Sequence, residues 1–473
     1  MTAGVFVASH APGRAQAVRG PAFWILVALV VFGPLPLGGV GAVWTYVYGL
    51  LVAVALLSYL LERRRRGRAL PPIPWPLGLA GALVALVACW GLLQSSPGWF
   101  AGSAHPVWAV AGERLGTADL VGALSVAPER GRLVALAWFG YLGFGLLVLW
   151  LAWRSSHRDF LLKLFLGVQA VYALYGLAVY FAGNATILWF EKTSYQDVLT
   201  STFVNRNSYA TYLGLGVLTA LALILRYLRR ALSDERSERT QMREFIETFT
   251  GRGWLVPMVL LLCFVALLLT GSRMGLTACL VGACVLLVGW TGRLAAGRAR
   301  TFGTGLLGLL VGLLVLNFVL SGGLTLERFE RLFTDGDGRF LVYPLMLEAI
   351  ESRPLTGHGL GAFESAFRLV RDARVSGYFD LGHSDYLELV MSVGWPAALA
   401  VFLAFGLGLG LAWRISRRCD DYEYALLAVA ATVQVAVHAA VDFSLQIPAV
   451  MQAYLLVVLA GVSGPMCSSR SNV

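Results

Sequence analysis

Residues 339–396 read RFLVYPLMLEAIESRPLTGHGLGAFESAFRLVRDARVSGYFDLGHSDYLELVMSVGWP, a polar island between two long apolar segments. Its arginines, together with one that comes just before it, are Arg328, Arg339, Arg353, Arg368, Arg371 and Arg374. Each flanking segment could span a bilayer, which needs roughly 20 mostly apolar residues. Because a stretch this polar cannot lie in lipid, we expect it at a membrane surface, where polar chemistry is possible.

The composition of the whole chain predicts a membrane protein. Of its 473 residues, 58% are hydrophobic and only 14% are charged, unlike a soluble domain. Apolar runs of spanning length recur about a dozen times, and they are too long and continuous for barrel strands. Because lipid admits only helices or closed barrels, the sequence predicts an all-α polytopic membrane protein with about 12 transmembrane helices.

The distribution of Lys and Arg predicts the orientation of these helices. The net charge of +10 comes largely from basic loops such as Arg63 to Arg66 and Arg414 to Arg418, which the positive-inside rule places in the cytoplasm. We therefore interpret the charge as topology and expect no nucleic-acid partner. Both chain ends then lie inside, and the partners expected from composition alone are membrane lipids.

The same pattern divides the chain into three parts. Residues 1–320 hold transmembrane helices 1–9 with their loops, residues 321–383 form a large helical periplasmic loop, and residues 384–473 hold transmembrane helices 10–12 and a cytoplasmic tail. We expect the tenth span to begin at Asp385. Within the loop, Gly357, Gly359 and Gly361 predict a tight corner rather than a nucleotide-binding loop, because no apolar strand precedes them.

The cysteines show no spacing typical of a metal site. They are Cys89, Cys263, Cys279, Cys284, Cys419 and Cys467, and none lies in the polar island. We expect no disulfide, no zinc site and no cofactor.

Three arginines fall at predicted outer ends of spans, where the positive-inside rule disfavours them. They are Arg206, Arg273 and Arg339. Bidentate guanidinium groups suit an anionic ligand, and a lipid-linked diphosphate would reach this depth. Asn205 and Asn207 flank Arg206 and are either ordinary helix caps or further donors to a phosphate group at a helix N-terminus.

His383 begins the predicted tenth span and is the candidate general base, because an imidazole can accept a proton from an alcohol near neutral pH. The alternative is that it only caps the helix or bonds within the loop. Asp385 and Glu388 could orient its ring or bind sugar, although Asp385 could merely complement the helix dipole. Tyr343 is a further candidate for substrate binding. His438 and Asp442, four residues apart, favour a structural hydrogen bond.

Four motifs occur in order on the predicted outer side. They are TFVNRNSYATYLGLG (202–216), LTGSRMGL (269–276), GRFLVYPLMLEAIESRPLTGHGLGAF (338–363) and GHSDYLELVMSVGWPAAL (382–399). Together they resemble the O-antigen ligase and O-antigen polymerase superfamily of bacterial inner-membrane glycosyltransferases, over roughly residues 200 to 450. Where family members often have Asn after the histidine, this chain has Ser384.

The resemblance implies a GT-C-like fold and metal-independent glycan transfer on the periplasmic face of the inner membrane. The donor would be a glycan on undecaprenyl diphosphate, and the acceptor a lipid A core for a ligase or a growing glycan for a polymerase. It also implies catalytic or diphosphate-binding roles for Arg273, Arg339 and His383, with Arg206 matching the motif of the sixth span. The shared motifs do not separate ligases from polymerases.

Two other classes of protein are less consistent with the sequence. A flippase or transporter typically has internal repeats and broken helices that meet at the membrane midplane, and no convincing repeat is visible. A metal-dependent transferase needs carboxylates in the first outward loop to hold a cation, and residues 33–41 contain none.

Overall fold

The computed structural model describes residues 19–117, 120–231, 253–320, 338–373, 375 and 378–464. The predicted loop residues 321–337 and the predicted tail from residue 465 lie outside this description. The helices are α1 (Pro21–Phe32), α2 (Ala42–Arg65), α3 (Trp75–Gln94), α4 (Val107–Leu115), α5 (Pro128–Leu151), α6 (Ser155–Phe181), α7 (Arg206–Ala231), α9 (Leu255–Leu269), α10 (Arg273–Thr291), α11 (Arg298–Leu320), α13 (Gly338–Ser352), α14 (Phe363–Val370), α15 (Asp385–Val393), α16 (Trp395–Arg418), α17 (Tyr422–Ala439) and α18 (Pro448–Val462). Short 3₁₀ turns are η1 (Leu37–Gly39), η2 (Ala101–Ser103) and η4 (Ser444–Gln446), and strands β1 (Thr186–Ile187) and β2 (Phe190–Glu191) pair antiparallel.

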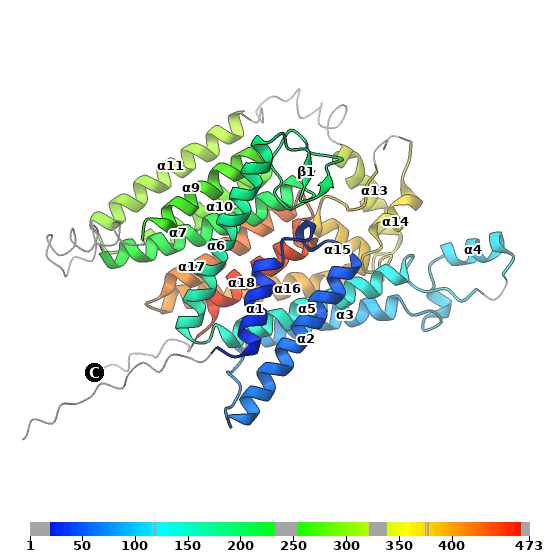
Figure 1. Ribbon diagram of the computed structural model, residues 1–473. Helices are drawn as coiled ribbons and strands as arrows, with labels where there is room; N and C mark the ends of the chain where they lie inside the picture. Colours follow the sequence, from blue (N-terminus) through cyan, green and yellow to red (C-terminus); the bar gives the residue numbers. More distant parts are fainter. Residues whose placement is uncertain are drawn as a thin grey trace, which may run out of the picture.

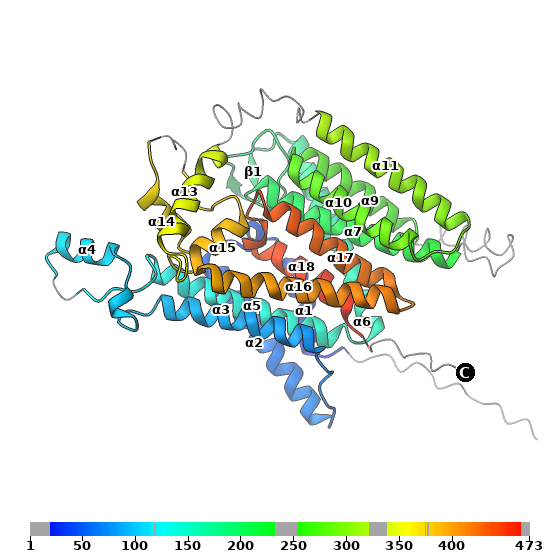
Figure 2. The same cartoon turned by 180° about the vertical axis from the view of Figure 1, so that it is seen from behind.

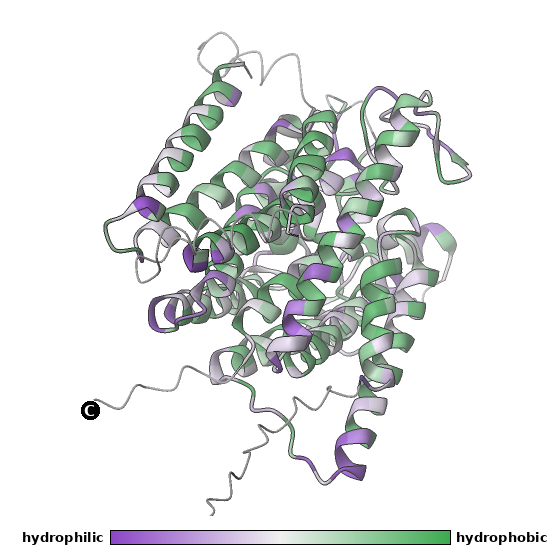
Figure 3. Ribbon diagram, turned by 60° about the vertical axis from the view of Figure 1, so that its left-hand side comes forward, coloured by the Kyte–Doolittle hydropathy of each residue, from purple (hydrophilic) through white to green (hydrophobic). Residues whose placement is uncertain are grey.

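The described part of the chain confirms the prediction of an all-α polytopic membrane protein. Nine of its helices are long and apolar enough to cross a membrane, and three shorter apolar helices, α1, α9 and α18, accompany them. Together these make the predicted dozen. In Figure 3 the apolar residues run along the helices, and polar residues gather toward helix ends.

The two ends of the helix bundle differ in character. The basic end carries the arginines in the last turns of α2, α7 and α16. The opposite, loop end carries η1, the β1–β2 hairpin, α13, α14 and η4, and it also holds the first residues of α7, α10 and α15. In Figures 1 and 2, α13 and α14 lie beside α15 and away from the basic ends of α7 and α16.

Helices α7 and α17 form the centre of the bundle. The apolar parts of α7 and α17 are 89% and 83% buried inside the protein. The apolar part of α11, at the edge, is only 6% buried. Small residues let neighbours approach α7: a side chain at Gly214 would collide with Gln434, and one at Gly216 with Gln169. Those two amides donate to the carbonyls of Thr211 (3.0 Å) and Tyr212 (2.8 Å), so buried polar groups cross-link the central helices.

The tenth span is interrupted, which corrects the predicted boundary. A helix does begin at Asp385, but it ends at Val393, and the spanning helix α16 begins at Trp395. Between them Gly394 has a φ of +79° and a ψ of 164°, which a helix cannot contain. Gly357 and Gly359 sit against this break, and the amide of Gly359 donates to the carbonyl of Ser392 (2.9 Å). The predicted glycine corner therefore packs against the interruption.

One expectation about the cysteines is wrong. Cys419, directly after α16, is disulfide-bonded, and its partner lies outside the described residues. Cys419 follows Arg417 and Arg418, in a basic loop that the positive-inside rule places in the cytoplasm, where disulfides are rare. Cys89, Cys263, Cys279 and Cys284 are free, as expected.

We predict that Gly394→Ala destabilises the protein by roughly 1–3 kcal/mol, because alanine is strained at positive φ and its Cβ would meet the carbonyl of Leu355. Gly406→Ala is the matched control, since that glycine lies inside α16 with nothing within 4 Å of the added atom. Thermal unfolding in detergent should show a lower Tm for Gly394→Ala only. Equal Tm values for the two variants would contradict the proposed packing of the glycine corner against the interruption at Gly394.

Candidate functional site

His383 lies at the loop end, immediately before α15. It does not cap that helix: the cap is Ser384, whose hydroxyl accepts from the amide of Leu387 (3.5 Å). His383 itself has a φ of +51°, a left-handed conformation that is unfavourable for a residue with a side chain. Such strain persists only where surrounding contacts fix the backbone, and it is common at functional sites.

Contacts on both sides of His383 fix this backbone. The hydroxyl of Tyr343 in α13 donates to the carbonyl of His383 (2.7 Å), and the amide of Gly382 donates to Oε2 of Glu388 (2.7 Å). The rings of Phe379 and Phe443 flank the imidazole, with centroids 6.0 and 4.8 Å away. Tyr343 and Glu388, both predicted to meet substrate, therefore contact the backbone around His383.

A buried carboxylate faces the imidazole. Nδ1 of His383 lies 3.4 Å from Oδ1 of Asp442, and the two side chains are 17% and 1% exposed. Among the described residues, neither atom has a hydrogen-bond partner, so the contact between them is one of ion-pair distance. Burial alone would raise the pKa of the Asp442 carboxyl, but the imidazoles of His383 and His438 outweigh it and lower that pKa. Asp442 is thus suited to hold the ring of His383 with its Nε2 outward.

A second imidazole lies behind Asp442. Nε2 of His438 is 3.9 Å from Oδ2 of Asp442, and its Nδ1 makes a short contact with the hydroxyl of Thr211 in α7. Thr211 also donates to Ser444 (3.0 Å), which in turn lies 3.4 Å from Oδ2 of Asp442. His438 and Asp442 are therefore close, as predicted, but the same carboxylate also reaches His383, which sequence reasoning missed.

Asp385 joins the start of α15 to the loop after α17. Its amide donates to the carbonyl of Asp442 (3.2 Å), and its carboxylate accepts from the amide of Leu445 (3.4 Å) and from Nε2 of Gln446 (3.1 Å). Asp385 and Glu388 are thus engaged by backbone and amide groups, and Asp442 faces the ring instead.

The motif around Arg206 begins α7. Oδ1 of Asn205 accepts from the amides of Asn207 (2.7 Å) and Ser208 (3.4 Å), so Asn205 caps the helix. Asn207 is buried. The guanidinium of Arg206 lies over the ring of Tyr195, 5.5 Å from its centroid, and a Cβ on Gly271 would lie 3.6 Å from Nη1 of Arg206. Arg206 therefore contacts the turn that precedes Arg273.

Arg273 is the first residue of α10, and its side chain is exposed. Ser272 caps α10 by accepting from the amide of Gly275 (3.2 Å). Arg339 lies in the first turn of α13, one turn before Tyr343, and its side chain lies outside the described part of the structure.

The predicted residues thus fall into two groups at one end of the bundle. In the first group, Tyr343 bonds the backbone of His383 and Glu388 bonds that of Gly382, while Asp385 ties the same helix start to the loop after α17. Arg206 contacts the turn of Arg273, and Thr211, about 7.5 Å further along the axis of α7, contacts the His438–Asp442 pair. In the described ranges no group of three His, Cys, Asp or Glu side chains could hold a metal ion.

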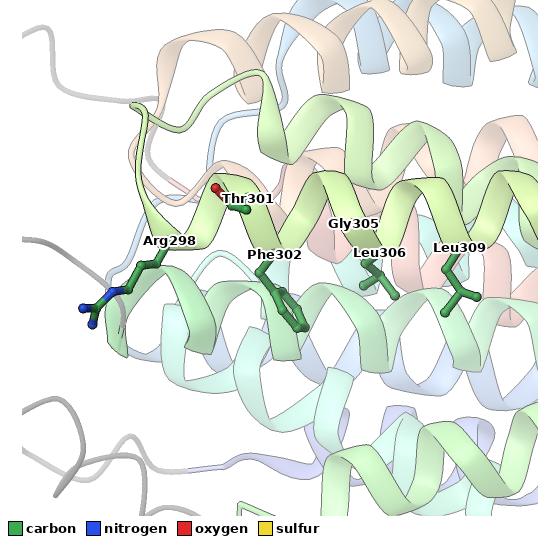
Figure 4. A pocket seen from close by; sticks show the side chains of 6 residues that line it. All are labelled: Arg298, Thr301, Phe302, Gly305, Leu306 and Leu309. Carbon is green, nitrogen blue, oxygen red and sulfur yellow. The ribbon is translucent and has the colours of Figure 1, made fainter.

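An apolar groove of about 650 Å³ lies elsewhere, along α11. Figure 4 shows Phe302, Leu306 and Leu309 along it, with Arg298 at one end. Because α11 is hardly buried by the rest of the protein, this groove lies on the outer surface of the bundle. It offers no group suited to proton transfer, so the candidate site remains at His383.

The buried Glu388 predicts a pH dependence of stability. Burial raises the pKa of its carboxyl from 4.5 to about 7, so the folded protein keeps a proton that the unfolded chain loses. The stabilisation is complete below about pH 4.5 and is lost as the pH rises through 7. Between about pH 5 and 8 the Tm of the wild type should therefore fall more than that of Glu388→Gln. Parallel Tm curves would contradict this assignment.

Residues 258–403 match the family model described as O-antigen ligase. Comparison with curated proteins found no match. The matched segment runs from α9 into α16, so it contains Arg273, Arg339 and His383 but neither Arg206 nor Asp442. Over this segment, the chain is similar to the O-antigen ligase family.

Proposed function

We propose that this multi-pass membrane protein transfers a glycan from undecaprenyl diphosphate to an acceptor hydroxyl, with His383 as general base. The family match supports an enzyme of the O-antigen ligase or polymerase type in general. The observation that supports His383 as the general base is the buried carboxylate of Asp442, whose Oδ1 lies 3.4 Å from Nδ1 of His383. An orienting carboxylate on one ring nitrogen leaves the other free to take a proton.

The proposed reaction is a single displacement at the anomeric carbon of the donor sugar. The acceptor oxygen forms the new bond to that carbon while its proton passes to Nε2 of His383. The bond between the anomeric carbon and the diphosphate oxygen breaks, and the diphosphate leaves on its lipid. Arg273 and Arg206, with Arg339, would stabilise the charge that develops on the leaving group, which preorganised cations do most effectively away from bulk water.

The proposal extends to location, domains and acceptor. The loop end would face the periplasm from the inner membrane in a GT-C-like architecture, with residues 321–383 as the periplasmic loop between the two groups of helices. A lipid A core is the favoured acceptor, and a growing glycan is the alternative. A flippase is the alternative of another class, but the His383–Asp442 pair has no evident part in lipid translocation. Transfer should need no added metal ion.

We predict that His383→Ala lowers the rate of glycan transfer by about 10²- to 10⁴-fold, the usual contribution of a general base. Binding of the lipid-linked donor should persist, because the arginines remain. Leu355→Ala, at an exposed residue of the same end, is the control for folding and should transfer at the wild-type rate. Transfer by His383→Ala at more than a tenth of the wild-type rate would reject the base assignment.

The decisive experiment supplies purified donor together with either a lipid A core or a second lipid-linked repeat, and identifies products by mass spectrometry. Glycan on the lipid A core supports a ligase, and joined repeats support a polymerase. Donor that crosses a vesicle membrane without any new glycosidic bond would favour the flippase. A parallel reaction with a chelator should give the same products.

A further inference from the structure

The segment between α6 and α7, residues 182–205, has an unusual backbone. Among the described residues, six non-glycine residues have positive φ, and four of them lie here: Asn184, Leu188, Tyr195 and Ser201. The other two, Leu37 and His383, also lie at the loop end. A left-handed residue costs roughly 1–2 kcal/mol, so this segment must be held by compensating contacts.

Asn184 and Lys192 supply those contacts from the interior of the segment. Nδ2 of Asn184 donates to the carbonyls of Gln196 (2.7 Å) and Val198 (2.8 Å), and its Oδ1 accepts from Nζ of Lys192 (2.6 Å). Asn184 and Lys192 are only 4% and 5% exposed. Burial lowers the pKa of the Lys192 ammonium to about 8, and the carboxylate of Asp197 partly opposes this shift. A cation is thus kept inside the segment at an energetic cost.

These contacts position Tyr195. Its carbonyl accepts weakly from Asn184 (3.4 Å) and lies 3.5 Å from Nζ of Lys192, while its ring covers the guanidinium of Arg206. On another side, Gly271 leaves room for the same guanidinium. Nε of Arg206 is buried without a hydrogen-bond partner, and in the described part of the chain no carboxylate pairs with this arginine. Arg206 is therefore held in place by a ring and a turn, with its charge uncompensated.

We infer that Tyr195 is a positioning residue that orients Arg206 toward the diphosphate of the lipid-linked donor, with Asn184 and Lys192 holding Tyr195 in place. This inference rests on the proposed function. An aromatic ring can hold a guanidinium without consuming its hydrogen-bond donors, whereas a carboxylate would neutralise it. The ammonium of Lys192 adds positive potential near the same site, which favours an anion.

The test is direct binding of farnesyl diphosphate, a short polyprenyl diphosphate, to the full-length protein in detergent. Tyr195→Leu should weaken binding about tenfold, within the range of a partly desolvated cation–π contact. Arg206→Ala should weaken it at least as much, and the double variant should be no weaker than Arg206→Ala. Lys192→Met should also weaken binding. Tyr378→Leu is the matched control, because Tyr378 lies beside an exposed arginine, Arg368, at the same end.

A purely structural role predicts different results. If Tyr195→Leu binds farnesyl diphosphate like the wild type, or if its effect adds fully to that of Arg206→Ala, the inference is overturned. His383→Ala separates this outcome from failure of the proposed function, because it should bind farnesyl diphosphate normally and yet transfer glycan about 10²- to 10⁴-fold more slowly. In transfer assays Tyr195→Leu should lower kcat/KM for the donor while leaving the Tm unchanged, whereas general misfolding would lower the Tm as well.

Discussion

The carboxylate of Asp442 is the group on which the candidate site depends. It is buried at the end of α17, and it lies between the imidazoles of His383 and His438. An unpaired carboxylate there would be costly, so the two imidazoles and the carboxylate stabilise one another. Because His383 immediately precedes α15 and His438 belongs to α17, this interaction also fixes the interrupted tenth span against the centre of the bundle.

The central helices give that carboxylate its rigid support. The hydroxyl of Thr211 in α7 contacts His438 of α17, and the backbone carbonyl of Thr211 accepts from Nε2 of Gln434 in α17. Polar groups buried between spans usually pair with one another, because lipid offers them no alternative. The start of α7, which carries Arg206, and the loop after α17, which carries Asp442, are thereby held at the same end of the bundle.

The sequence predicted the features that are encoded locally. The dozen spans follow from the lengths of apolar runs, and His383 at a helix start follows from the GHSD motif. Asn205 proved to be the helix cap that its residue type favours. The break at Gly394 also had a local signal that was not used, because glycine followed by Trp-Pro is typical of a helix beginning.

Contacts between side chains that are far apart in the sequence could not be predicted in the same way. Asp442 reaches His383 only because α15 and the loop after α17 meet in space, and no periodicity in one chain reports that contact. The neighbouring Asp385 and Glu388 could have oriented the His383 ring or bound sugar, and in the structure their carboxylates accept from backbone amides. The roles proposed for Lys192 and Tyr195 likewise depend on a loop conformation with several left-handed residues, which the residue types do not suggest.

The most direct test of the account is the rate of a single turnover of glycan transfer by Asp442→Asn, measured beside its binding of farnesyl diphosphate. Asparagine keeps the shape of the side chain but removes the charge that orients and stabilises the imidazole. We expect donor binding close to that of the wild type and a transfer rate lower by about 10²- to 10⁴-fold. Transfer within about twofold of the wild-type rate would contradict the central role of the Asp442 carboxylate.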